Sequence, residues 1–262
     1  MNTRIKIIGL LAILLSVSAI TWAIQVRYFK QGRKPVIQQK AQWAVPVYDK
    51  VLLEKLERLG KHYDTLKQAY TIKGTISMRD KADTVSPVKN VVFIYCKKGK
   101  ELYYRLGETE TINANGMYLY IDHPARRILV ARQKDVSEAP VITDMTRVVA
   151  GLKSEYYDLS GSVSGSVQTL SLRNEHHISC KQYTVAYDTL SYAIRHIYAR
   201  LNDPQDPLNR KKENVMQMDL SEWDGKAALA TYTVPEAVIR RYGSKWRTTE
   251  KYKGYELIDT TD

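Results

Sequence analysis

Histidines are the side chains in this 262-residue sequence whose positions come closest to a chemical use. His176 and His177 are adjacent, so on a strand their rings would point to opposite faces and could not bind one metal ion. His123 lies between Asp122 and Pro124, a combination that is typical of a turn. We therefore expect no metal site, and we interpret these histidines as structural residues.

Glycine, serine and carboxylate patterns also lack the parts that catalysis needs. Gly161 and Gly165 are followed by no lysine, which a phosphate-binding loop requires. No serine occupies the Gly-x-Ser-x-Gly motif of hydrolases. Asp219 and Glu222 have the spacing of surface residues. We expect segment 161–166 to be a flexible polar loop, and the sequence predicts no catalytic residues, no enzyme activity and no cofactor.

The two cysteines, Cys96 and Cys180, lie in apolar, strand-like runs. In an exported chain they could form a disulfide, and as buried residues they could equally remain free thiols. Neither follows the apolar amino-terminal segment as a lipid-attachment cysteine would. The sequence leaves the pairing open and predicts that the chain is not itself a lipoprotein.

The chain is basic, with a formal net charge of +12 and a pI near 9.5. Its densest cluster of cations, Arg27–Lys40, directly follows the apolar amino-terminal segment, where it can contact anionic lipid head groups. A second cluster, Arg210–Lys212, follows a proline-containing loop. Because no helix-turn-helix, zinc-finger or aromatic RNA-binding motif accompanies these charges, we expect no nucleic-acid partner.

Residues 7–26 carry no charge and are almost continuously apolar. About 20 helical residues, at a rise of ~1.5 Å each, cross the ~30 Å hydrocarbon core of a bilayer. The run is longer than the apolar region of a usual signal peptide, about 7–15 residues, and no clean cleavage site follows it. We therefore favour a membrane anchor over a cleaved signal peptide or a buried core helix. The membrane-facing residues that we expect are Ile7, Leu11, Leu15, Ile20 and Trp22.

The charges around this segment oppose the location that we favour. More cations follow the segment than precede it, and the positive-inside rule then places the carboxyl-terminal domain in the cytoplasm. The rest of the chain instead resembles an envelope domain. We predict a single-pass inner-membrane protein with a periplasmic carboxyl-terminal domain, and a cytoplasm-facing domain is the alternative.

After the basic linker, the hydrophobic pattern changes from a helical period to a strand period. Apolar residues recur every three or four positions within 51–66, which predicts an amphipathic helix. From Tyr70 to Met78 they alternate with polar residues, and similar short runs continue to a closing strand at 252–258. Short turns such as Asn115–Gly116 connect these runs, so we expect an antiparallel meander of roughly ten strands. A second, short helix is expected at 143–152.

These elements predict an α+β fold: a curved antiparallel sheet, forming an open or half β-barrel with covering helices, preceded by a transmembrane helix. The expected parts are a short basic amino terminus (1–6), the anchor or signal segment (7–26), a basic linker (27–47) and one β-rich domain (48–262).

Several segments resemble the periplasmic outer-membrane lipoprotein carriers and their receptor relatives, the LolA/LolB-like superfamily. Helix 51–66 running into Tyr70–Ile76 is similar to the opening of that family. Segments 102–106, 111–122 and 126–130 are similar to its central meander, and 183–187 and 194–197 to its second half-sheet. The resemblance implies an unclosed barrel whose helices cover an apolar cavity for acyl chains. A retained anchor and a polar insertion at 79–87 depart from the pattern of a diffusing carrier.

The ligand-binding residues that we predict are Tyr95, Tyr104, Tyr118 and Tyr120, with Arg105 as the nearest candidate for the carriers' functional arginine. The predicted function is that of a non-enzymatic, membrane-anchored envelope domain that binds a lipid or an acylated (lipoprotein) ligand in a concave sheet. The alternative is a structural or interaction subunit of a multi-protein envelope complex.

Overall fold

A computed structural model describes residues 46–63, 69–81, 88–135, 149, 151–152, 154–203, 205–207, 209–225, 227, 229–232, 234–243 and 245–261. The predicted anchor at 7–26, with its five membrane-facing residues, lies outside the described residues, as do 1–6 and most of the linker and of the helix at 143–152. Among the helices that the structure describes, none has the length and apolarity to cross a membrane.

The chain forms two compact units, of which the first comprises residues 1–65 and 138–159. Its described helix, α2 (Lys50–His62), confirms most of the helix predicted at 51–66. Asp49 begins the helix, because its carboxylate accepts a hydrogen bond from the backbone N–H of Val51 at 2.7 Å. The Tyr48 hydroxyl lies 2.9 Å from the carbonyl oxygens of both Leu152 and Tyr157, which ties the two segments of this unit together.

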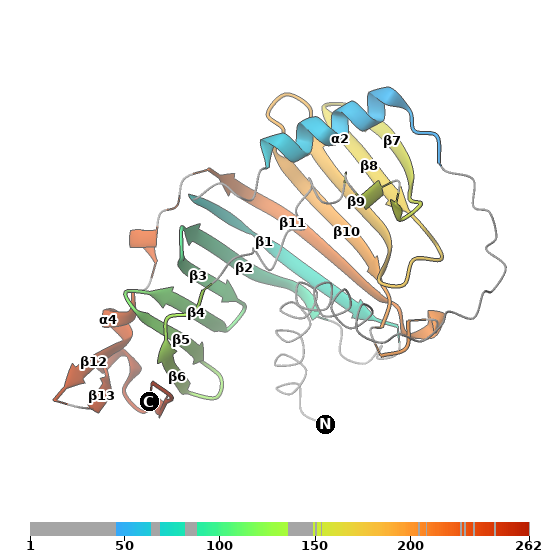
Figure 1. Cartoon of the computed structure of the whole chain (residues 1–262). Coiled ribbons are helices and arrows are strands. Elements are labelled where there is room, and N and C mark those ends of the chain that lie inside the picture. Colours follow the sequence, from blue (N-terminus) through green and yellow to red (C-terminus); the bar gives the residue numbers. More distant parts are fainter. Residues whose placement is uncertain are drawn as a thin grey trace, which may run out of the picture. The chain divides into compact units, whose positions relative to one another are not determined.

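The second unit, residues 66–137 and 160–262, is built on a curved twelve-stranded sheet (Figure 1). The strand order is β14-β6-β5-β4-β3-β2-β1-β11-β10-β9-β8-β7, so the described strands leave two edges and do not close into a barrel. The bounds are β1 (Ala69–Asp80), β2 (Val88–Lys98), β3 (Glu101–Leu106), β4 (Thr109–Ala114), β5 (Met117–Asp122), β6 (Arg127–Arg132), β7 (Asp158–Ser164), β8 (Val167–Arg173), β9 (Cys180–Asp188), β10 (Ile194–Leu201), β11 (Asn214–Asp224) and β14 (Glu256–Asp259).

Positive backbone φ angles explain the tight turn that the sequence predicts between β4 and β5. Asn115 and Gly116 have φ values of 52° and 78°, which these two residue types adopt at little cost. The resulting register pairs Ala114 with Met117, and the meander from β1 to β6 is antiparallel throughout. This part of the predicted fold is confirmed.

Two expectations about secondary structure are wrong. Segment 161–166 is not a flexible loop, because residues 158–164 form β7 and a turn at Gly165–Ser166 leads into β8. The side chains of β7 are almost all exposed, so no apolar alternation marks it as a strand. The closing strand is β14, which pairs parallel with β6, while Tyr252 lies in a preceding 3₁₀ turn, η3 (Glu250–Tyr252). A long connection from β11 permits this parallel pairing, unlike the short turns of the meander.

The carboxyl-terminal segment packs on one face of β2–β6. It contains η2 (Leu229–Thr231), α4 (Pro235–Val238), the hairpin β12 (Ile239–Tyr242) and β13 (Lys245–Thr248), and η3. The buried side chains that join it to the sheet are Cys96, Tyr103, Ile112, Leu119, Ile121, Ile128, Val130, Val238, Ile239 and Tyr252. A 3₁₀ turn, η1 (Arg210–Lys212), carries the second basic cluster of the sequence.

Candidate ligand-binding face

Strand register places the four predicted tyrosines on one face of the sheet. Tyr95 pairs with Tyr104 across β2 and β3, and Tyr104 pairs with Thr111 on β4. Thr111 pairs in turn with Tyr120 on β5, two residues from Tyr118. Because paired residues share a face and residues two apart along a strand do too, all four tyrosines point the same way.

Arg105 lies on the opposite face, because it directly follows Tyr104 on β3. Its side chain is exposed, and its Nε donates a hydrogen bond to the carbonyl oxygen of Gly107 at 3.0 Å. The structure therefore brings Tyr95, Tyr104, Tyr118 and Tyr120 together and separates Arg105 from them by the thickness of the sheet.

The same face continues across the other half of the sheet, and we call it the tyrosine face. The register of β1, β11, β10, β9 and β8 puts their large apolar residues on it. Its described apolar and aromatic members include Tyr70, Ile72, Ile76, Phe93, Tyr95, Leu102, Tyr104, Leu106, Tyr118, Tyr120, Leu170, Leu172, Val185, Tyr187, Ile197, Met218, Leu220 and Trp223. Most are buried, whereas Tyr118, Tyr120 and Trp223 remain partly exposed.

Aromatic rings form a row across the middle of the tyrosine face. Tyr70 stacks on Trp223 and on Tyr95, with ring centroids 6.2 Å and 5.6 Å apart. The Tyr95 ring meets Tyr104 edge to face at 6.0 Å. These spacings are those of favourable aromatic pairs, so the row is a stable part of the sheet that also presents flat, polarisable surface.

Two hydroxyl groups of this row are buried without a hydrogen bond. Tyr70 is 3% exposed and Tyr95 is fully buried, and neither hydroxyl has a partner among the described residues. Burial is the main cause that raises the pKa of Tyr70 to about 12, and burial likewise raises the pKa of Tyr95. Both groups therefore stay neutral donors at ordinary pH, and leaving such a donor unsatisfied costs about 1–3 kcal/mol.

On the opposite face, His123 belongs to a closed hydrogen-bond network. Its Nε2 lies 2.8 Å from Glu110 Oε1, and its Nδ1 lies 2.9 Å from the Tyr255 hydroxyl. The other Glu110 oxygen accepts a hydrogen bond from Tyr103 at 3.0 Å. His123 does begin a turn, as predicted, and it also joins the carboxyl-terminal segment to β4. Tyr255 lies 132 residues from His123 in sequence, so no local pattern could have revealed the contact.

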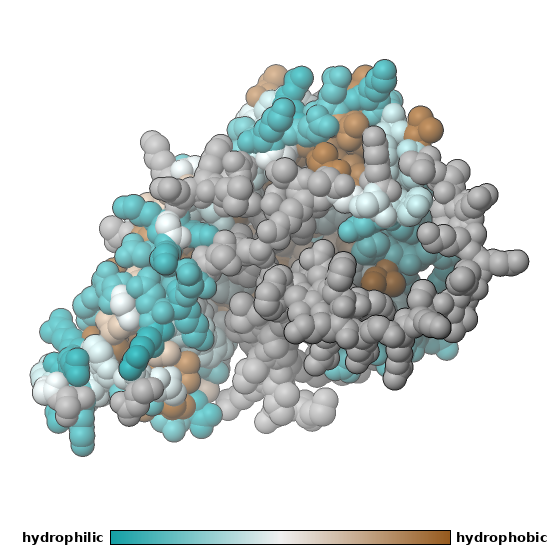
Figure 2. Space-filling view, viewed as in Figure 1, coloured by the Kyte–Doolittle hydropathy of each residue, from teal (hydrophilic) through white to brown (hydrophobic). Residues whose placement is uncertain are grey.

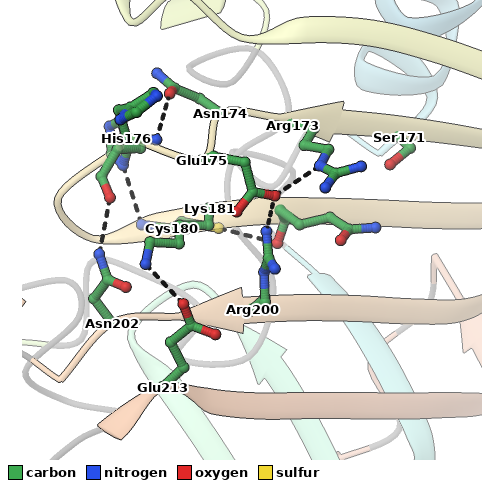
Figure 3. Close-up of polar contacts among 12 residues, drawn as sticks. Ser171, Arg173, Asn174, Glu175, His176, Cys180, Lys181, Arg200, Asn202 and Glu213 are labelled. Carbon is green, nitrogen blue, oxygen red and sulfur yellow. Dashed lines mark hydrogen bonds and ion pairs between the residues drawn. The ribbon is translucent and has the colours of Figure 1, made fainter. Parts of the chain in front are cut away.

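Charged side chains gather near one end of β9, β10 and β11, and Lys181 and Glu213 are the buried ones among them (Figure 3). Lys181 Nζ lies 2.7 Å from Glu213 Oε1, and Lys81 bonds the other oxygen of that carboxylate. Glu175 accepts hydrogen bonds from Arg173 and Arg200 beside them. The partners come from different strands and loops, so sequence reasoning missed this cluster. Four cations share two carboxylates here, so each cation has a carboxylate partner, as a structural cluster requires.

The remaining candidates of the sequence have structural surroundings. His176 and His177 lie in the loop between β8 and β9, and His177 Nδ1 accepts a hydrogen bond from the backbone N–H of Cys180 at 3.1 Å. Cys96 and Cys180, whose pairing the sequence leaves open, form no disulfide with each other in this structure. No group of three or more potential ligands that could hold a metal ion occurs among the described residues.

An open pocket of about 340 Å³ lies beside the opposite face rather than among the four tyrosines. Strands β3 and β4 line it together with the segment that leads to α4. Its lining includes Tyr103, Ile112, Leu229, Lys98 and Glu101. The volume is near the lower limit of pockets that hold small ligands.

No family model matches this chain, and no curated protein matches it significantly. Among solved structures, an uncharacterized conserved protein from Thermus thermophilus has a TM-score of 0.37 and 9% identity, over 79% of this chain and 98% of that chain. A LolA superfamily protein from Nitrosomonas europaea has a TM-score of 0.26 and 10% identity, over 68% and 94%. A DUF1329 family protein from Desulfovibrio piger has a TM-score of 0.25 and 10% identity, over 68% and 91%. One of these neighbours is described by the name of the superfamily that the sequence resembles.

Proposed function

We propose that this chain is a non-enzymatic envelope protein whose β-rich domain binds a lipid or an acylated ligand along the tyrosine face. The observation that supports this proposal is the register, which aligns apolar and aromatic side chains from nine strands of the sheet on one face, while β4 contributes polar residues between β3 and β5. Burying a methylene group contributes about 0.8 kcal/mol, so an acyl chain laid on such a face would bind favourably.

The unsatisfied hydroxyls of Tyr70 and Tyr95 give this face a polar feature that suits an acyl ligand. An ester, amide or carboxyl oxygen of the ligand would accept a hydrogen bond from either hydroxyl and so remove the cost of leaving it unpaired. The partly exposed rings of Tyr118 and Tyr120 lie further along the same face and would contact the hydrocarbon part.

Uptake of a fluorescent fatty-acyl probe by the delipidated full chain tests this proposal. We expect Tyr120→Lys to weaken uptake at least about tenfold, because a charge in the path of the acyl chain costs more than the 1.4 kcal/mol that equals one decade. Arg105→Glu is the matched control, since it changes a charge on the opposite face of β3, two strands from β5, and should leave uptake unchanged. Equal effects of the two substitutions, or no uptake by the unaltered chain, would refute lipid binding on this face.

We further propose that residues 7–26 anchor the chain in the inner membrane and that the β-rich domain faces the periplasm. The apolar length of the segment supports the anchor, and the flanking cations argue for the opposite orientation. A phosphatase fused after residue 262 should be active in intact cells if the domain is periplasmic, and an inactive fusion would place the domain in the cytoplasm.

The alternative function, an interaction subunit of an envelope complex, is favoured by the edge strand β7. Its side chains are mostly exposed, and it ends the order of the described strands. Such an edge can accept a strand from another protein. Crosslinking in intact cells through a photoreactive residue at Val163, which is 61% exposed, should then capture a stable neighbour. A chain that runs alone after crosslinking would count against this alternative.

A further inference from the structure

The hairpin β12–β13 has one anchored face and one outward face. Ile239 is 1% exposed and Trp246 is half-buried, and both pack with the core that joins the carboxyl-terminal segment to the sheet. The register pairs Arg240 with Arg247 and Tyr242 with Lys245, so these four residues share the other face. All four are exposed, and Tyr242 retains 57% of its accessible surface.

The hairpin is strongly positive. Of its eight strand residues, Arg240, Arg241, Lys245 and Arg247 are cations and none is an acid. None of these cations forms an ion pair within the described part of the chain, whereas Lys73, Arg127 and Lys253 each have a carboxylate partner. The nearest acids in sequence are engaged elsewhere: Glu236 accepts a hydrogen bond from Asn115, and Glu250 pairs with Lys253.

The arrangement of these cations is costly for the hairpin itself. Arg240 and Arg247 are direct cross-strand partners, and like charges in that position are destabilising. Aromatic rings compensate in part, since the Arg247 guanidinium lies 5.6 Å from the Tyr242 ring centroid and that of Arg241 lies 5.7 Å from the Trp246 ring. An unpaired cluster of this kind is stabilised when an external anion neutralises it.

We propose that the β12–β13 hairpin is a contact surface for anionic lipid head groups. Lysines and arginines near a negatively charged bilayer surface are attracted to it, and tyrosine and tryptophan rings favour the same interfacial layer. The outward face of the hairpin presents both kinds of side chain, since Arg240, Lys245 and Arg247 lie beside the ring of Tyr242. Figure 2 shows hydrophilic side chains predominating where Figure 1 places β12 and β13. This proposal does not depend on lipid binding by the tyrosine face.

Hydrogen exchange of the full chain, incubated with vesicles of phosphatidylcholine alone or mixed with phosphatidylglycerol, tests the proposal locally. We expect the backbone amides of 239–248 to gain protection only with phosphatidylglycerol, and high salt to abolish this gain. A cation near the surface contributes about 1 kcal/mol, which corresponds to a change of about fivefold. The lipid concentration that gives half protection should therefore rise about 25-fold in Arg240→Gln/Arg247→Gln.

The matched control is Arg210→Gln/Lys211→Gln, which removes two cations from the basic cluster on η1. It should leave the protection of 239–248 unchanged. Equal protection on phosphatidylcholine alone, or an equal loss in the two double variants, would overturn the proposal. Protection by DNA or polyglutamate without protection by phosphatidylglycerol would overturn it too, and would assign the hairpin to a polymeric partner.

Discussion

Lys181 and Glu213 form a buried ion pair, with Nζ and Oε1 2.7 Å apart and the two side chains only 5% and 3% exposed. Lys181 lies on β9, and Glu213 directly precedes β11, so the pair bridges strands that flank β10. Lys81, at the end of β1, bonds the same carboxylate from a more exposed position. One carboxylate thus serves two cations, so removing its charge leaves both without this partner.

Glu213→Gln should lower the free energy of unfolding by about 3–5 kcal/mol, because it leaves the Lys181 ammonium buried without a counter-charge. Urea titration of the full chain followed by circular dichroism measures the change. Glu222→Gln is the control: it breaks the Lys73–Glu222 pair, which has the same 2.7 Å distance on an exposed surface, and should cost no more than about 1 kcal/mol. Equal losses of unfolding free energy in the two variants would show that burial does not determine how much the Lys181–Glu213 ion pair contributes to stability.

The same carboxylate should give the fold a specific acid sensitivity. Burial alone would raise the pKa of Glu213, but hydrogen bonds from Lys181 and Lys81 outweigh it and lower the pKa from 4.5 to about 2. A lowered folded-state pKa contributes stability above the unfolded-state value, and this contribution is lost as the pH falls from 4.5 toward about 2. In that window the stability of the unaltered chain should fall more steeply than that of Glu213→Gln, by up to about 1.4 kcal/mol per pH unit. If the unfolding free energies of the two proteins fall equally with pH, Glu213 is not the source of the acid sensitivity.

Local patterns in the sequence predict much of the sheet. Alternation from Tyr70 to Met78 and the Asn115–Gly116 turn identify β1 and the β4–β5 hairpin, because both signals act between neighbours in the chain. They also fix which tyrosines share a face once the register is known. The edge strand β7 carries no such signal, since a strand exposed on both sides has no apolar side to reveal it.

Contacts between distant residues are what the sequence does not reveal. Glu213 is 32 residues from Lys181, and Tyr255 is 132 residues from His123, so neither pairing has a local pattern. Arg105, the nearest candidate for the carriers' functional arginine, lies on the face opposite the tyrosines, because alternation places consecutive residues of a strand on opposite faces. Whether the four tyrosines bind a ligand stays a prediction.

Gly74 should tolerate no side chain, because β1 and β11 approach closely at the irregularity between Lys73 and Gly74. A Cβ atom there would lie 2.2 Å from the backbone oxygen of Asp219 and 3.0 Å from the Phe93 ring. Gly74→Ala should destabilise the fold by about 1–3 kcal/mol, measured by urea titration. Gly225→Ala, where a Cβ atom would meet nothing within 4 Å, is the control and should have little effect. A Gly74→Ala chain as stable as the control would mean that the two strands separate at no cost.

Tyr95→Phe should raise the stability of the ligand-free chain and weaken its binding of an acyl ligand. The substitution removes a fully buried hydroxyl that has no partner among the described residues, so the folded state gains about 1 kcal/mol or more. Tyr103→Phe is the matched control on the neighbouring strand, where the buried hydroxyl donates to Glu110 at 3.0 Å, and its loss should destabilise by a similar amount. Changes of opposite sign in the free energy of unfolding, measured by urea titration, would show that the two buried hydroxyls differ in whether they have a hydrogen-bond partner.

If the Tyr95 hydroxyl donates to the ligand, probe uptake by Tyr95→Phe should fall even though its fold is more stable. A gain in stability without a loss of uptake would mean that the aromatic row only stabilises the sheet and that the carbonyl group of the acyl ligand does not bind Tyr95.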